Sequence, residues 1–162
     1  MPDAPRVPDE PMSDAAPTEL AARGTTLSLA LGFETLTDRA CGMRAPFRAD
    51  LVGDPAGGAI ATGVIFALLD QTCGMAISQA LRNRAAAENR ALGFGGMATL
   101  DFRLDHIRAP RPGAAVVGEA ECLRITGDVA VVRGWAYEDD PDDPIAAAQA
   151  AFMITQAPSA SA

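Results

Sequence analysis

The sequence predicts an α+β domain in which one long buried helix is wrapped by a curved antiparallel sheet. Residues 61–81 contain no proline and are apolar on almost every side, which is typical of a helix that lies inside a protein. From Thr99 onward the apolar pattern changes to a period of two, and strand-length segments alternate with turn residues. A helix followed by several strands indicates an α+β architecture.

Size and composition support one folded domain. The chain has 162 residues, of which 49% are hydrophobic and 21% charged, so it is long enough to bury a core and unlike a disordered chain. The net charge of −8 and the absence of an arginine cluster argue against a nucleic-acid partner. Small anionic ligands stay compatible with this composition, since a few arginines or a helix N-terminus can bind a phosphate.

The cysteines and the apolar runs indicate the compartment. Three widely spaced cysteines, Cys41, Cys73 and Cys122, and a start without a signal-peptide pattern predict a reduced, cytoplasmic protein. The longest apolar run, residues 64–69, is far shorter than the roughly 20 residues that cross a bilayer. We therefore expect no membrane span.

The ends of the chain are expected to be disordered and the middle folded. Residues 1–18 contain five prolines and few large apolar side chains, which predicts a loose tail. Residues 19–155 form the predicted domain, and the small polar residues 156–162 a flexible tail. Within the domain, residues 33–51 favour a bent strand pair with a turn at Cys41-Gly42.

The helix is expected to lead through a polar, helix-compatible surface connection, residues 82–90, to a break at Gly93–Gly96. Leu100, Phe102 and Leu104 then alternate with polar residues, which predicts a half-buried strand. Three further strands follow in an antiparallel meander, separated by turn residues: 114–124, 129–137 and 145–154.

Asp70 is the clearest candidate for chemistry. It is the one carboxylate or base in residues 61–81, on a helix otherwise built for burial. A buried unpaired carboxylate costs several kcal/mol, so it needs a hydrogen bond, a shifted pKa or a water-filled site. The residues alone leave two interpretations open: a functional acid, or an acid that caps a neighbouring backbone or faces solvent at the helix edge.

Four segments resemble a known family: Gly53-Asp54-Pro55, Ala61–Asp70, Cys73-Gly74 and Thr99–Pro110. Their layout over residues 32–155 is similar to the PaaI-like hotdog-fold acyl-CoA thioesterases of phenylacetate degradation. In that family a Gly-Asn-Pro segment is followed by His-Gly-Gly at the start of the central helix. The catalytic Asp comes two turns later.

The resemblance implies a role for each matching residue. Asp70 would be the general base or nucleophile that attacks the thioester, directly or through water. The backbone N–H of Thr62 would contribute to the oxyanion hole. Thr99 would position the water, and Asp54, in place of the family's Asn, would help to hold it from the partner subunit.

The chain departs from the family at the central motif. Ala61 replaces the motif His and Thr62 its first Gly, while Gly63 is retained. By position, Ala61 and Gly63 would contact the substrate. Loss of the His removes hydrogen bonds that the family uses near the substrate carbonyl.

By this resemblance the protein would hydrolyse acyl-CoA to a free acid and CoA, without a cofactor, as a homodimer or a tetramer of two dimers. The first alternative is a non-catalytic acyl-CoA-binding hotdog protein, favoured by the missing His. The second is a hotdog hydratase or dehydratase, which the only histidine, His106, argues against because it lies on a strand.

Other reactive residues have simpler interpretations. One histidine and three cysteines without paired spacing predict no metal site. Cys73 is expected to pack in the core, and His106 to be a polar strand residue. Two groups of arginines could meet CoA phosphates or form a solvated surface: Arg82, Arg84 and Arg90, and Arg108 and Arg111.

Overall fold

The computed structural model describes residues 29–36, 40–90 and 94–156. The predicted N-terminal tail, 1–18, and residues 157–162 of the predicted C-terminal tail lie outside these ranges. The elements are β1 (Gly32–Leu36), β2 (Ala40–Ala45), a short 3-10 helix η1 (Ala49–Leu51), β3 (Val52–Asp54), β4 (Ala59–Ile60), α3 (Thr62–Ala87), β5 (Phe94–His106), β6 (Val116–Thr126), β7 (Val129–Tyr137) and β8 (Ala146–Gln156).

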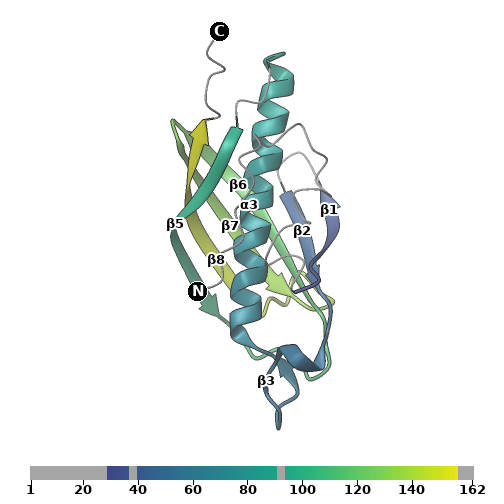
Figure 1. Ribbon diagram of the computed structural model, residues 1–162. Coiled ribbons are helices and arrows are strands. Elements are labelled where there is room, and N and C mark those ends of the chain that lie inside the picture. The colour runs from purple at the N-terminus through teal and green to yellow at the C-terminus, as the bar shows by residue number, and fades with distance from the viewer. Residues whose placement is uncertain (1–28, 37–39, 91–93, 157–162) are drawn as a thin grey trace, which may run out of the picture.

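Six strands form one antiparallel sheet in the order β1-β2-β6-β7-β8-β5, and β3 and β4 form a separate hairpin. The sheet curves around α3, which lies along its concave face, and the hairpin leads into the N-terminal end of the helix (Figure 1). The predicted fold class is therefore confirmed, and the arrangement is the hotdog fold. Strand β5 lies at one edge of the sheet, beside α3.

Close packing of α3 on the sheet depends on a glycine in β6. A Cβ atom at Gly118 would lie 2.9 Å from Cγ of Leu68 and 3.0 Å from Oγ1 of Thr72. Thr72 is fully buried, and its hydroxyl donates to the Leu68 carbonyl over 2.7 Å. This buried polar group therefore has a hydrogen-bond partner. The small residue at 118 thus sets the distance between helix and sheet.

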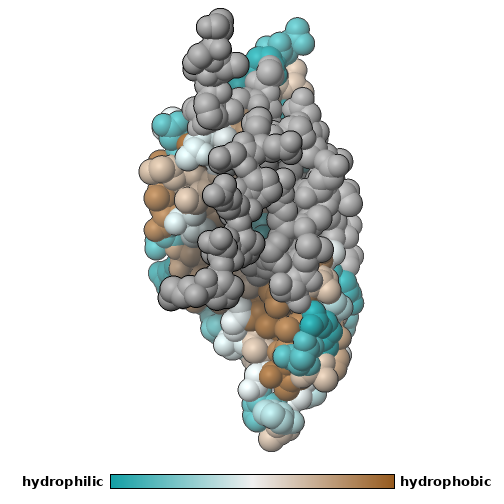
Figure 2. All heavy atoms as spheres, viewed as in Figure 1, coloured by the Kyte–Doolittle hydropathy of each residue, from teal (hydrophilic) through white to brown (hydrophobic). Residues whose placement is uncertain are grey.

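By length and composition alone α3 could cross a membrane, but 61% of its most apolar window is buried inside the fold. That burial is expected of a core helix, and the absence of a membrane span stays a prediction. Apolar surface is nevertheless visible beside the N-terminal half of α3 (Figure 2). Two of the large apolar side chains that are exposed, Phe66 and Leu100, belong to the neighbouring elements α3 and β5.

Two predictions for local segments were wrong. Cys41 and Gly42 are not a turn: they lie inside β2, buried and paired with Ala120 and Glu119 of β6. The helix itself continues to Ala87, through most of the helix-compatible residues that follow Leu81.

The break predicted at Gly93–Gly96 is also wrong where the structure describes it, since β5 already begins at Phe94. Gly96 lies at an irregularity of pairing with β8 and has a φ of 153°, which favours glycine. At the other end of the domain, β8 extends to Gln156, two residues beyond the predicted strand end at 154.

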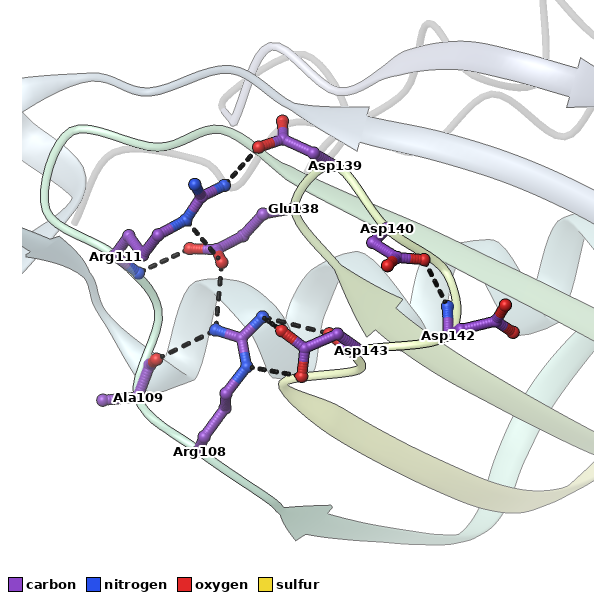
Figure 3. A network of polar contacts seen from close by, with 8 residues as sticks. All are labelled: Arg108, Ala109, Arg111, Glu138, Asp139, Asp140, Asp142 and Asp143. Atoms are coloured by element: carbon purple, nitrogen blue, oxygen red, sulfur yellow. Dashed lines mark hydrogen bonds and ion pairs between the residues drawn. The ribbon is translucent and has the colours of Figure 1, made fainter.

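An ion-pair network joins the β5–β6 and β7–β8 connections (Figure 3). The Glu138 side chain is only 2% exposed, and its Oε2 accepts from Arg108 and from Arg111, each over 3.0 Å. The backbone N–H of Arg111 donates to the other carboxylate oxygen. The β5–β6 connection also contacts the β3–β4 hairpin, because the Gly113 N–H donates to the Gly58 carbonyl over 3.0 Å.

We expect Glu138→Gln to lower the free energy of unfolding at pH 7 by about 1–3 kcal/mol, because a buried charged hydrogen-bond acceptor is lost. Burial alone raises the pKa of Glu138, but the Arg111 N–H and the two guanidiniums outweigh it and hold the pKa below its ordinary value. The stabilisation is therefore present above the unfolded pKa, about 4.3, and is lost as the pH falls through the folded pKa.

Urea unfolding at fixed protein concentration, repeated from pH 7 downward, measures both effects. The matched control is Glu88→Gln, which changes an exposed carboxylate that also pairs with two arginines, Arg84 and Arg90. We expect a much smaller change there, since solvent screens exposed pairs. Equal losses in the two variants would contradict a special role for Glu138.

Candidate functional site

The structure brings Asp70 and Thr99 together across two elements. Asp70 lies in the middle of α3, on the side toward β5, and is partly buried. The Thr99 hydroxyl donates to Oδ1 of Asp70 over 2.9 Å, although the residues are 29 positions apart in the chain. Asp70 is thus a carboxylate with a specific hydrogen-bond partner on the neighbouring strand.

A bulge in β5 turns Thr99 toward the helix. Thr99 pairs with the buried Phe152 of β8, whereas Asp101 pairs with Ala151, so Leu100 is an extra residue between them. An extra residue shifts the alternation of side chains by one position. Leu100 is therefore 52% exposed instead of buried, which corrects the prediction that it shares a half-buried face with the other apolar residues of β5.

Beyond the bulge, Phe102 faces α3, and its ring lies 4.6 Å from the ring of Phe66, measured between centroids. The two rings are tilted by 54°, an arrangement common for aromatic pairs. This contact seats β5 against the N-terminal half of the helix.

A cavity of about 340 Å³ opens beside Asp70 and Thr99. The rest of its lining comes from α3, β5 and β8 and is mainly apolar: Gln71, Gly74, Met75, Ser78, Phe94, Gly96, Met97 and Phe152. A mainly apolar cavity with a few polar groups in its wall is typical of a site for a small apolar ligand with one reactive group.

The other predicted site residues form a second group at the start of α3. Ala61 is the N-cap of the helix and has no side chain that can cap it, while Thr62 and Gly63 are exposed. Asp54 lies in the adjoining hairpin, where its Oδ1 accepts from the Ala56 N–H over 3.0 Å. Free N–H groups in a first helical turn favour negative charge on a ligand.

The two groups are not one site within a single chain. Thr62 and Asp70 are eight residues apart on the same helix, which corresponds to about 12 Å along its axis. The structure therefore joins Asp70 to Thr99, and places Asp54 near the start of the helix with residues 61–63. It leaves the two groups separated.

The arginines proposed for CoA phosphates are largely engaged with carboxylates. Arg108 contacts Glu138 and Asp143, and Arg111 contacts Glu138 and Asp139.

The sequence analysis missed the buried residue Glu138. This residue begins an acidic, proline-containing loop, and such a composition predicts a solvent-exposed segment. The alternation of β7 up to Tyr137 was the one signal that the next residue could be buried.

The remaining reactive side chains fit their simpler interpretations. Cys73 is buried, and burial, with a smaller effect from Asp70, raises the pKa of its thiol to about 12, so it is confirmed as a core residue. His106 is exposed at the last position of β5. In the described parts of the chain, no three His, Cys, Asp or Glu side chains gather in a way that could hold a metal ion.

Residues 57–145 match the model of the thioesterase superfamily. A protein from Pseudomonas aeruginosa of known crystal structure is 34% identical, with a TM-score of 0.65 over 77% of this chain and 85% of that chain. A second P. aeruginosa protein is 24% identical, with a TM-score of 0.68 over 85% and 98% of the two chains. A thioesterase from Haemophilus influenzae, 15% identical, shares the fold with a TM-score of 0.71 over 89% and 91%. No curated protein matches the sequence.

Proposed function

The chain belongs to the thioesterase superfamily, and from this premise we propose that it hydrolyses acyl-CoA thioesters to a free acid and CoA. The observation that carries the proposal is the Asp70–Thr99 pair in the lining of a mainly apolar cavity. A carboxylate there can act on a thioester carbonyl while the cavity receives the acyl group. The PaaI-like subfamily is part of this proposal.

In the proposed reaction Asp70 removes a proton from a water molecule as the water oxygen bonds to the thioester carbonyl carbon. Because Oδ1 of Asp70 already accepts a hydrogen bond from the Thr99 hydroxyl, Oδ2 is the atom that accepts this proton. The carbon–sulfur bond then breaks, and Asp70 returns the proton to the sulfur, so that CoA leaves as a thiol. Direct attack by the carboxylate, followed by hydrolysis of the anhydride, is the second route open to this residue.

We also propose that two copies assemble along β5. This strand is an edge of the sheet, and edge strands present unpaired backbone groups to a second chain. Phe66, Leu100 and Ile107 are 43%, 52% and 56% exposed, on or next to the elements of this edge. A twofold arrangement would place Asp70 of one chain near Thr62 and Asp54 of the other, and so unite groups that one chain separates.

Light scattering at micromolar concentration is expected to give at least twice the chain mass of 16.7 kDa. Leu100→Asp should lower this mass to that of the monomer and remove turnover, because a charge would be buried at the interface. Leu123→Asp is the matched control, since Leu123 is 46% exposed on a different strand, β6. A monomeric parent protein would contradict the dimer and the shared site.

Thiol release from a panel of acyl-CoAs tests the activity itself. Steady release is the expected result. The alternative function, a non-catalytic acyl-CoA-binding protein, is favoured by Ala61, which supplies no hydrogen-bonding side chain at the start of α3. Tight binding of acyl-CoA without release would support that alternative and contradict the hydrolase.

A further inference from the structure

The cavity beside Asp70 follows the helix. Asp70, Gly74 and Ser78 line it at intervals of four residues, so they lie on one face of α3 and span about 12 Å along its axis. Thr99 contacts Asp70 and Met97 lies opposite Gly74, so β5 passes the helix in the opposite direction. The cavity lining therefore extends from the carboxylate along this face of α3 toward Ser78 and Phe94.

Gly74 is an unexpected residue in the interior of a 26-residue helix, because glycine destabilises a helix relative to alanine. The packing gives a reason for it. A Cβ atom at position 74 would lie 3.2 Å from the sulfur of Met97, closer than ordinary van der Waals contact. The missing side chain lets the Met97 sulfur pack against the helix, and a methyl group at position 74 would push that sulfur away from it.

Three large side chains give the cavity an apolar lining. Phe152 lies opposite Thr99 and Phe94 lies beyond Met97 on β5; they are 3% and 5% exposed, and Met75 is 9% exposed. Ser78 is also buried, but its hydroxyl donates to the Gly74 carbonyl over 3.1 Å. Among the described residues of the lining Asp70 is the only charged one, so a second charge on the acyl group would be buried without a partner there.

We propose that Met97, packed against Gly74, forms a gate that sets the length of the acyl chain, and that the substrates carry an uncharged apolar acyl group. The proposal rests on the proposed thioesterase function. The thioester carbonyl lies at Asp70, the first part of the chain lies beside Phe152, and a longer chain reaches Phe94 only when the Met97 thioether moves aside. Methionine suits this position because its unbranched thioether adapts to chains of different shape.

The test compares kcat/KM for a series of saturated acyl-CoAs from acetyl to palmitoyl. Gly74→Ala is expected to lower kcat/KM for the longest substrates that the parent accepts by roughly tenfold or more relative to acetyl-CoA, the scale of one methylene in a tight pocket. Met97→Ala removes the opposite wall and should shift the optimum to longer chains. Gly74→Ala should unfold at the same or a higher temperature, because alanine favours the helix.

Gly32→Ala is the matched control, because a Cβ atom there meets nothing within 4 Å. Its chain-length profile should equal that of the parent. Unchanged profiles in folded Gly74→Ala and Met97→Ala would overturn the gate while parent turnover upholds the proposed function. If the parent binds acyl-CoAs without turnover, the chain-length profiles are measured as affinities instead. Absence of both binding and thiol release in the parent would overturn the gate and the proposed function together.

Discussion

Replacing Asp70 by asparagine is expected to lower thioester turnover by about a hundredfold or more, the usual scale for loss of a general base. The amide keeps the shape of the side chain, and its oxygen can still accept from the Thr99 hydroxyl, 2.9 Å from Oδ1 in the parent. It cannot accept a proton from water. The fold should therefore survive while the chemical step fails.

Thiol release under single-turnover and steady-state conditions measures the effect, with urea unfolding and light scattering on the same samples. Asp128→Asn is the matched control: it makes the same change at an exposed position in the turn between β6 and β7, away from the cavity and from β5. We expect it to keep parent turnover. Unchanged turnover in a folded, dimeric Asp70→Asn protein would remove Asp70 from the mechanism.

The second large effect is expected at the start of α3, where Ala61→His combined with Thr62→Gly should raise turnover. Ala61 is the N-cap of the helix and Thr62 its first residue, and both are at least partly accessible to solvent. A histidine adds a hydrogen bond near the substrate carbonyl, and a glycine lets the backbone N–H turn toward the developing oxyanion. One such donor contributes about 2.7–4 kcal/mol, so a gain of tenfold or more is within reach.

Turnover and acyl-CoA affinity of the two single variants and the double variant decide the outcome. A double variant that folds, dimerises and turns over no faster than the parent would contradict a weakened oxyanion hole. In that case parent turnover would show that other residues compensate, with Asp54 and Thr99 the first to test. Affinity without turnover would instead assign the chain to binding.

The fold class and the position of Asp70 within a buried helix were predictable from the sequence because both depend on local patterns. An apolar helix must be buried, and strands with turn residues between them must cover it, so residues 61–81 and the meander that follows lead to one architecture. A single carboxylate in such a helix stands out for the same reason. The roles of Asp54, Thr62 and the retained Gly63 came from family resemblance and stay predictions.

Local patterns failed where long-range contacts decide. Cys41-Gly42 looks like a turn because glycine favours turns, but pairing with β6 and burial under α3 hold both residues in a strand. Glu138 looks solvated because acids follow it, but two arginines from the β5–β6 connection meet it in space. The contacting residues in each case come from distant parts of the chain, and no local pattern predicts them.

The sequence by itself determined a buried helix, a curved sheet around it and an acid within that helix. Only the tertiary structure decided which side of β5 reaches Asp70, because the bulge at Leu100 reverses the alternation that the sequence pattern predicts. It also decided that a cavity opens there, since the cavity walls come from three different elements, α3, β5 and β8. Alternation is a property of neighbouring residues, whereas register, bulges and cavities arise from packing between elements far apart in the chain.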